Sequence, residues 1–439
     1  MADTILIIGG GLAGSEAAWQ IARRGVKARL YEMRPGQMTP AHKTGLLAEL
    51  VCSNSLKSDN PARAHGVLKA ELRRLGSLIM CAADQTAVPA GDALAVDRDL
   101  FAGEITRALE EEPLVEIVRE EVTEIPEQGP VIVASGPLTS QPLARNLFRF
   151  TGAEYLFFYD ALSPIVSAES INQEVCFLAS RYEKGEAAYW NCPLNQEQYE
   201  AFYEALMGAE RTLHADYDPR ELFEGCLPVE VIAARGLDTL RFGPMKPVGL
   251  VNPHTGEQPY AVVQLRPENN ELTMYNLVGF QTSLRYPEQQ RVFRMIPGLE
   301  QAEFLRFGAV HRNTYLNAPT LLRPTLQSRA RKDLFFAGQI TGVEGYLEST
   351  AAGWLAGVNA TRLLQGKAPV ELPEGSLFGA LVHHICTADP DHFQPMNANF
   401  GLLPSIQGLA PAAKRERRAS RGPECLAALE EFLEAHPDL

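Results

Sequence analysis

Two cysteines stand in surroundings that favour a reactive thiol. Cys226 lies in "FEGCLPVEVIAARG", just before a Leu-Pro step and a run with helical spacing. A helix N-terminus carries partial positive charge and free backbone N–H groups, and these stabilise a thiolate, the form that attacks electrophiles. Cys52 lies in "ELVCSNSLKS", where hydroxyl, amide and ammonium groups follow it. By contrast, Cys176 and Cys81 stand in apolar runs, and we expect both to be buried as small hydrophobic residues.

A second group with chemical potential is the glycine series at the start of the chain. Thr4 to Ile8 is an apolar run typical of a buried parallel strand, and Gly9, Gly11 and Gly14 follow as G-x-G-x-x-G. Alanines and isoleucine then recur at helical spacing until Gly25. Glycines at these positions let the backbone approach a pyrophosphate, whose charge the helix N-terminus stabilises. Strand, glycines and helix in this order predict a dinucleotide site.

An acidic residue stands where such a site needs one. A second strand is predicted from Val26 to Tyr31, and it ends at Glu32, with Arg34 close behind. A carboxylate at the end of the second strand binds ribose hydroxyls in sites of this kind.

The far end of the chain indicates that the dinucleotide is FAD. A short strand, Leu334 to Ala337, is followed by several glycines and then by a helix of small residues. This order resembles the flavin-contacting segment of FAD proteins with two dinucleotide-binding domains, and "VIVASGP", residues 131–137, resembles their internal strand-to-glycine turn. Tyr346 is a candidate to stack on flavin or pterin, and core packing is the alternative. The predicted cofactor-binding residues are Gly9, Gly10, Gly11, Leu12, Ala13, Gly14, Glu32, Arg34, Gly136, Gly338, Gln339, Gly342 and Tyr346.

Because the two halves of this site lie at opposite ends of the chain, we predict an α/β protein with a discontinuous Rossmann-like FAD-binding domain and an inserted α+β domain. The first part of the FAD-binding domain takes residues 1–155, the insertion takes 156–315, and the second part takes 316–439 with a basic tail. Within the insertion, Asn195 is a predicted helix N-cap, and Glu268 to Glu271 a hairpin turn.

Composition excludes several classes. The chain has 439 residues and a net charge of −14, which argues against a generally basic nucleic-acid coat but leaves room for a local basic patch. Its seven scattered cysteines fit a reducing compartment and form no CxxC pair. The apolar runs are too short for a signal peptide or a membrane span. We expect a cytoplasmic protein without a membrane partner.

The last part of the chain offers two further features. His383, His384 and His392 match no familiar ligand spacing, so we predict no metal site. A basic cluster at residues 414–421 is either a solvated helix start or a phosphate contact. Arg63, Lys69, Arg73 and Arg74 are further candidates for holding phosphates.

Several segments together resemble a known family. They are "GGGLAGSEAA", "CSNSLKS", "GCLPVEVIAARG", "FGPMKPVGL", "YNLVGFQT", "HRNTYLNAP" and "FAGQITGVEGYLES". This set resembles the TrmFO family of folate- and FAD-dependent tRNA (uracil-5-)-methyltransferases. The first segment is shared with the GidA/MnmG relatives, which carry a long C-terminal helical domain for which this chain has no room.

The resemblance implies methylation of C5 of the T-loop uridine in tRNA. Carbon would come from 5,10-methylenetetrahydrofolate, and reducing equivalents from NAD(P)H through FAD. The family's two reactive cysteines fall on Cys226 and Cys52. A thiolate that adds to C6 of uracil makes C5 nucleophilic, and we assign that addition to Cys226. Cys52 then assists as proton acceptor or by protecting the site. The resemblance leaves the oligomeric state open.

Two other functions remain as alternatives. A flavin-dependent thiol/disulfide oxidoreductase acting on a small molecule would use Cys52 and Cys226 as a redox pair. The chain lacks a CxxxxC motif and a second G-x-G-x-x-G, which counts against it. A flavoprotein with only a binding or scaffold role is the third possibility.

Overall fold

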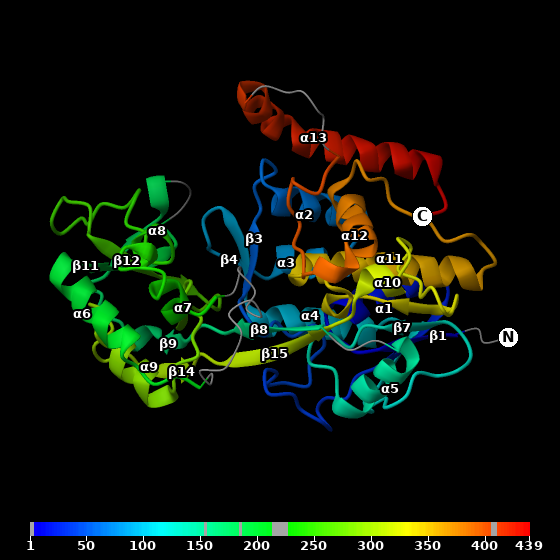
Figure 1. The fold of residues 1–439 in the computed structure, drawn as a ribbon, viewed down its shortest axis with the longest axis horizontal. Helices are drawn as coiled ribbons and strands as arrows, with labels where there is room; N and C mark the ends of the chain where they lie inside the picture. Colours follow the sequence, from blue (N-terminus) through cyan, green and yellow to red (C-terminus); the bar gives the residue numbers. More distant parts are fainter. Residues whose placement is uncertain (1–3, 153–155, 184–186, 213–226, 405–410) are drawn as a thin grey trace.

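The computed structural model describes residues 4–152, 156–183, 187–212, 227–404 and 411–439. Two lobes lie side by side, and a long C-terminal helix crosses the top of the larger lobe (Figure 1). Within the described residues, every helix is too short or too polar to cross a membrane.

A parallel five-stranded sheet forms the centre of the larger lobe. Its strand order is β16-β7-β1-β2-β6. The strands are β1 (Thr4–Ile8), β2 (Lys27–Tyr31), β6 (Val115–Val118), β7 (Val131–Val133) and β16 (Leu334–Phe336). Strands from both ends of the chain share this sheet, so the domain is discontinuous, and the predicted fold class is confirmed.

The helices of the larger lobe pack on this sheet and on one another. They are α1 (Leu12–Arg23), α2 (Ala64–Arg74), α3 (Leu78–Gln85), α4 (Arg98–Glu110), α5 (Gln141–Thr151), α10 (Ala318–Leu321), α11 (Tyr346–Leu364), α12 (Leu377–Thr387) and α13 (Pro411–Ala435). Helices α1 and α11 lie against each other at very short range, since a Cβ atom on Gly353 would stand 2.2 Å from the carbonyl oxygen of Ala13. This contact brings the glycine-rich start of the chain next to α11, which follows the last strand of the sheet.

A small antiparallel sheet supports the segment that contains Cys52. It consists of β3 (Ser55–Ser58), β5 (Ala93–Val96) and β4 (Ala87–Val88), in that order. Strand β3 therefore begins soon after Cys52 and carries the polar residues that follow it.

The smaller lobe is built on an antiparallel sheet with the order β10-β11-β12-β13-β9-β14. The strands are β9 (Ile165–Ser167), β10 (Phe177–Ala179), β11 (Tyr189–Leu194), β12 (Ala261–Pro267), β13 (Met274–Leu277) and β14 (Phe304–Arg306), and the helices are α6 (Gln196–Met207), α7 (Val229–Ala233), α8 (Thr239–Phe242) and α9 (Tyr286–Phe293). Two sequence predictions are confirmed here, because Asn195 caps α6 with a capping box and β12 and β13 pair as a hairpin. The lobe has its own apolar core around Phe202, Phe280 and Phe293.

Two long strands run between the lobes. They are β8 (Leu156–Ala161) and β15 (Val310–Tyr315), which pair antiparallel so that Leu156 lies opposite Tyr315 (Figure 1). The chain thus enters and leaves the smaller lobe along one ribbon. We propose 156–315 as the bounds of the inserted domain, with 1–155 and 316–439 forming the other.

One expectation about burial is wrong. Cys176 is buried as expected, but Cys81 is exposed. Helix α3 turns Leu78, Ile79 and Ala82 inward, which leaves Cys81 on the opposite face.

Candidate active site

The glycine-rich turn between β1 and α1 leaves the start of the helix open. Gly9 has a φ of +108°, and a Cβ there would lie 2.5 Å from the carbonyl oxygen of Ala134. Gly11 is the N-cap of α1, and a Cβ on it would have no heavy atom within 4 Å. The first backbone N–H groups of α1 therefore face free space, which is the arrangement that binds a phosphate.

That space belongs to a cavity across the carboxyl ends of the parallel strands. Its lining follows the strand order: Glu121 and Val122 after β6, Glu32 and Arg34 after β2, Gly9 to Ala13 after β1, Ser135 and Gly136 after β7, then Gly338, Gln339 and Tyr346 after β16. A cavity drawn out along a sheet edge suits an elongated ligand with a phosphate near its middle.

Two of the predicted cofactor residues do not line the cavity. A Cβ on Gly14 would lie 1.8 Å from the carbonyl oxygen of Gly9, so Gly14 lets α1 pack against the turn. Gly342 has a φ of +85°, and a Cβ there would lie 2.5 Å from the ring of Phe393. Both glycines therefore serve packing outside the cavity, whereas the other predicted residues line it.

The carboxylate of Glu32 is held ionised at the end of β2. It accepts hydrogen bonds from the backbone N–H of Gly10 and from Nε of Arg34, both at 2.9 Å. Burial alone would raise its pKa, but the hydrogen bond and charge of Arg34 outweigh burial, and the pKa of Glu32 lies below its usual value.

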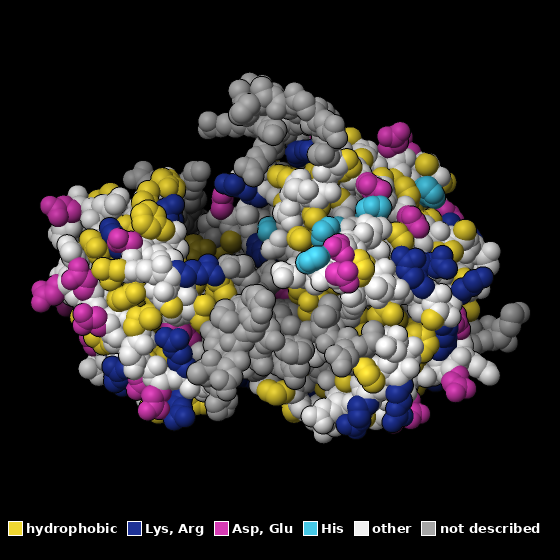
Figure 2. All heavy atoms as spheres, in the orientation of Figure 1, with side chains coloured by type: hydrophobic (Ala, Val, Ile, Leu, Met, Phe, Trp, Pro, Cys, Tyr) yellow, Lys and Arg dark blue, Asp and Glu magenta, His cyan; other side chains and the backbone are white. Residues whose placement is uncertain are grey.

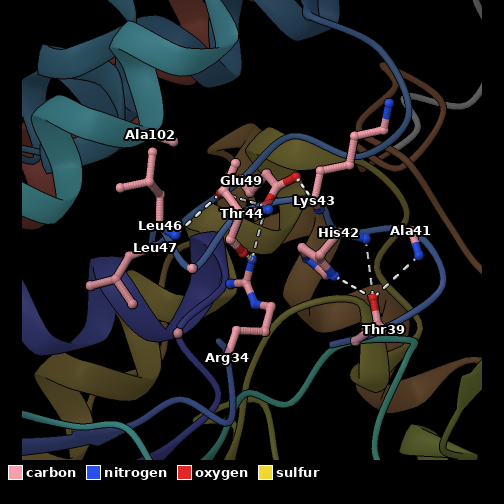
Figure 3. A network of polar contacts seen from close by, with 12 residues as sticks. Arg34, Thr39, Ala41, His42, Lys43, Thr44, Leu46, Leu47, Glu49 and Ala102 are labelled. Carbon is pink, nitrogen blue, oxygen red and sulfur yellow. Dashed lines mark hydrogen bonds and ion pairs between the residues drawn. The ribbon is translucent and has the colours of Figure 1, made fainter. Parts of the chain in front are cut away.

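A second carboxylate completes this network. Arg34, which is only 2% exposed, also pairs with Glu49 at 3.1 Å. Figure 3 shows Glu49 receiving hydrogen bonds from the backbone N–H groups of Lys43 and Thr44, at 2.8 and 3.0 Å. Glu49 thereby connects the backbone of the loop after β2 to the side chain of Arg34. Sequence reasoning missed Glu49 because it lies in a loop without a motif.

At the other end of the cavity, Tyr346 joins the first turn of α11 to Cys52. Its phenol oxygen accepts hydrogen bonds from the backbone N–H groups of Cys52, at 2.8 Å, and Ser53, at 3.0 Å. Burial and then the nearby thiol of Cys52 raise the pKa of Tyr346. Tyr346 also lines the cavity, so the segment that carries Cys52 lies beside the end of the cavity formed by β16 and α11.

Arginines hold the same segment through its carbonyl groups. Arg98 donates to the carbonyl oxygen of Leu50 at 2.7 Å and pairs with Glu268 of the smaller lobe at 2.5 Å. Arg306 donates to the carbonyl oxygen of Cys52 at 3.2 Å. Burial, followed by the charge of Arg98, lowers the pKa of Arg306 to about 10. Both lobes therefore position Cys52. The local sequence around Arg98 and Arg306 carries no motif that indicates this positioning role.

Comparison with known proteins identifies the family. A family model described as "Glucose inhibited division protein A" matches residues 4–368. The chain is 58% identical over 431 residues to the "Methylenetetrahydrofolate--tRNA-(uracil-5-)-methyltransferase TrmFO" of Pelotomaculum thermopropionicum, with 98% of each chain covered. It is 61% identical over 409 residues to the TrmFO of Moorella thermoacetica, with 93% of each covered. The chain belongs to the TrmFO family.

The protein has the same overall fold as a solved structure. It is that of Aquifex aeolicus GidA in the form II crystal, with a TM-score of 0.71 and 19% identity over 98% of this chain and 73% of that one. This likeness concerns the fold alone, and it supports the parallel sheet with an inserted domain described above.

The second predicted thiol, Cys226, lies outside the described residues. The helix expected to follow it is present as α7, which begins at Val229 with Pro228 at its N-cap. The sequence pattern indicated a helix that continues to Gly236. Helix α7 is shorter, since it has only five residues and ends at Ala233.

The basic residues predicted to contact phosphate separate into different environments. Lys69 is fully buried, and its Nζ donates to the carbonyl oxygen of Ser58 at 2.6 Å, so it is unavailable to an external ligand. Arg63, at the N-cap of α2, is exposed and forms no ion pair among the described residues. The side chains of the cluster at residues 414–419 lie outside the described part of the chain.

The remaining two candidates are already paired. Arg73 bonds to Asp59 at 3.0 Å and to Asp84 at 2.7 Å, and Arg74 forms an ion pair with Glu430 of α13. A phosphate would have to displace carboxylates at both. Of the four candidates on and before α2, Arg63 alone keeps an accessible, unpaired charge within the described residues.

The histidines near the C-terminus lie apart from this site. His383 pairs with Glu374 at 3.3 Å and His392 with Asp389 at 2.7 Å, at exposed positions. In the described part of the chain, no three or more ligating side chains gather in a way that could hold a metal ion.

Proposed function

We propose that the protein methylates C5 of the T-loop uridine in tRNA, with 5,10-methylenetetrahydrofolate as the carbon source. The main support is its identity with TrmFO enzymes, which extends over nearly the whole chain. The alternative of a thiol/disulfide oxidoreductase is disfavoured, because the matched relatives carry the methyltransferase name.

The residues around the cavity fit FAD. The space in front of Gly11 and the N-terminus of α1 suit a pyrophosphate, and Glu32, which lines the cavity, would accept hydrogen bonds from ribose hydroxyls. The wall formed by Gly338, Gln339 and Tyr346 would receive the flavin, with the Tyr346 ring as a stacking surface. Bound FAD, reduced by NAD(P)H, supplies the reducing equivalents that convert a folate methylene into a methyl group.

The protein's own residues would activate the pyrimidine. C5 of uracil is a poor nucleophile until a thiolate adds at C6, and we assign this addition to Cys226. Cys52 accepts the proton released from C5 or protects the site. The hydrogen bonds from the Cys52 and Ser53 amides to Tyr346 support this role, because they hold the Cys52 segment beside the proposed flavin position.

The RNA must reach this position from outside. A base inside a folded loop has to leave its stack to react, so we propose that the target uridine is extruded. Lys and Arg side chains lie along the boundary between the lobes on the face shown in Figure 2, and Arg63 and the cluster at 414–421 are our candidates for phosphate contacts. Because its substrate would be tRNA, we further propose that the protein works in the cytoplasm.

The decisive experiment offers the purified protein a T-loop RNA, labelled methylenetetrahydrofolate and NADPH. We expect label at C5 of the target uridine, and no label when that uridine is replaced by cytidine or when folate is omitted. Cys226→Ala and Cys52→Ala should each abolish labelling, whereas Cys81→Ala, a change at an exposed thiol, should leave it intact. Consumption of NADPH without any label in the RNA would rule out the methyltransferase assignment.

A further inference from the structure

Among the described residues that line the cavity, one glutamate has a buried carboxylate oxygen without a hydrogen-bond partner. Glu121 follows β6 and lines the cavity, and its Oε1 atom is buried without a hydrogen bond among the described residues. A buried carboxylate oxygen that accepts nothing is costly, because it has lost its hydration and gained no donor in exchange. A ligand group that donates a hydrogen bond at this point would remove that cost.

The segment that carries Glu121 is held firmly next to the end of β2. Arg119 donates to the carbonyl oxygen of Arg34 at 3.2 Å and to that of Gly45 at 2.6 Å. The backbone N–H of Glu32 donates to the carbonyl oxygen of Val118 at 2.9 Å. Glu121 therefore lies two residues beyond an anchored arginine, one strand beyond Glu32 in the order of the sheet.

The strand order indicates which part of a dinucleotide would meet Glu121. The N-terminus of α1, after β1, suits the pyrophosphate, and Glu32, after β2, suits the adenosine ribose. Strand β6 comes next in the same direction, at a spacing of about 4.8 Å per strand. The group that follows the ribose outward is the adenine base, whose exposed donor is the exocyclic amine.

We propose that Glu121 accepts a hydrogen bond from the exocyclic amine of the FAD adenine and so makes the site select adenine. This inference rests on the proposed use of FAD. Under this proposal a single side chain discriminates between adenine and a base that lacks the amine. That side chain comes from a part of the sequence without a nucleotide-binding motif.

The test compares FAD with an analogue in which the adenine amine is replaced by hydrogen. Each is titrated into the full-length protein after its flavin has been removed, and binding is followed by flavin fluorescence. We expect the unaltered protein to bind FAD roughly tenfold or more tightly than the analogue, because a hydrogen bond to a charged acceptor is lost. In Glu121→Ala this ratio should fall to near one, and in Glu121→Gln, which keeps a neutral acceptor, it should lie between.

Two controls separate this effect from general damage. Glu124→Gln, an exposed change a few residues along the same segment, should keep the original ratio. FMN, which lacks the adenosine half, should bind equally to the unaltered protein and to Glu121→Gln.

The outcomes distinguish the inference from the proposed function. An unchanged ratio in Glu121→Ala, or an equal weakening of FAD and the analogue, would show that Glu121 does not meet the amine and would overturn the inference alone. Failure of the unaltered protein to bind FAD at all would overturn the proposed function and this inference with it.

Discussion

The phenol oxygen of Tyr346 lies 2.8 Å from the backbone nitrogen of Cys52 and accepts its hydrogen bond. The two residues are 294 positions apart in the chain. Through this contact helix α11, whose first turn lines the cavity, holds the segment of a candidate catalytic thiol. The contact is specific enough to test by removal of one oxygen atom.

Tyr346→Phe should impair methylation while the protein keeps its flavin. The ring remains in the cavity wall, but the amides of Cys52 and Ser53 lose their common acceptor, at a cost of roughly 1–3 kcal/mol. We expect kcat to fall at least about tenfold because Cys52 is no longer held in place. Bound flavin, measured by absorbance, should stay near its original level. Tyr199→Phe, which removes a hydrogen bond to the carbonyl oxygen of Leu237 in the smaller lobe, is the matched control and should leave kcat unchanged.

Two glycines of the same turn should respond differently to alanine. Gly11→Ala places a methyl group in the open space of the cavity, so the flavin-free protein should change in unfolding free energy by less than about 1 kcal/mol. FAD affinity should fall at least about tenfold, because the methyl group occupies the proposed pyrophosphate position. Gly14→Ala drives a methyl group into the carbonyl of Gly9 and should cost more than about 2 kcal/mol of stability. Denaturant unfolding and flavin titration of both variants check this, and equal stability of the two would contradict it.

Removal of the Arg63 charge should weaken tRNA binding in a salt-dependent way. If Arg63 contacts one phosphate, Arg63→Ala should reduce the slope of log affinity against log salt by roughly 0.7–0.9. Binding can be followed by filter retention of tRNA over a range of salt concentrations. Arg107→Ala is the control, since Arg107 is exposed but paired with Glu104 and Glu111 on α4. An identical slope for Arg63→Ala and the unaltered protein would remove Arg63 from the interface.

Buried Glu71 should make stability depend on pH. Its carboxyl group receives the backbone N–H groups of Leu377 and Phe378, both at 2.8 Å, at the start of α12. Burial nevertheless raises the pKa of Glu71 from 4.5 to about 8. Between these values the folded protein holds a proton that the unfolded chain has released, so the unfolding free energy is highest below pH 4.5 and falls as the pH rises toward about 8.

Glu71→Gln removes this titration. The difference in unfolding free energy between the variant and the unaltered protein should shift in favour of the variant by roughly 2–5 kcal/mol from pH 4.5 to pH 8. Denaturant titrations at several pH values measure it, with the exposed change Glu110→Gln as the reference. A difference that stays constant with pH would mean that Glu71 titrates alike in both states.

Much of the lining of the candidate cofactor cavity could be predicted because its signals are local. Gly9, Gly11 and Glu32 belong to one strand–turn–helix–strand unit, in which spacing along the chain decides spacing in space. The same holds for Asn195, whose cap involves residues three positions away. Where solvent exposure rather than spacing mattered, sequence reasoning was less successful, as for Cys81 and Lys69.

By itself, the sequence determined the family, the dinucleotide turn, the discontinuous sheet and the two candidate thiols, since each depends on neighbouring residues or on the order of segments. Only the tertiary structure decided that Tyr346 and Arg306 hold the Cys52 segment and that Glu49 pairs with Arg34. It also decided that Glu121 lines the cavity with one carboxylate oxygen buried and without a donor among the described residues. These contacts join residues from distant segments or depend on which way a side chain is buried. Their existence follows from how the two lobes and the loops pack, and no local pattern encodes that packing.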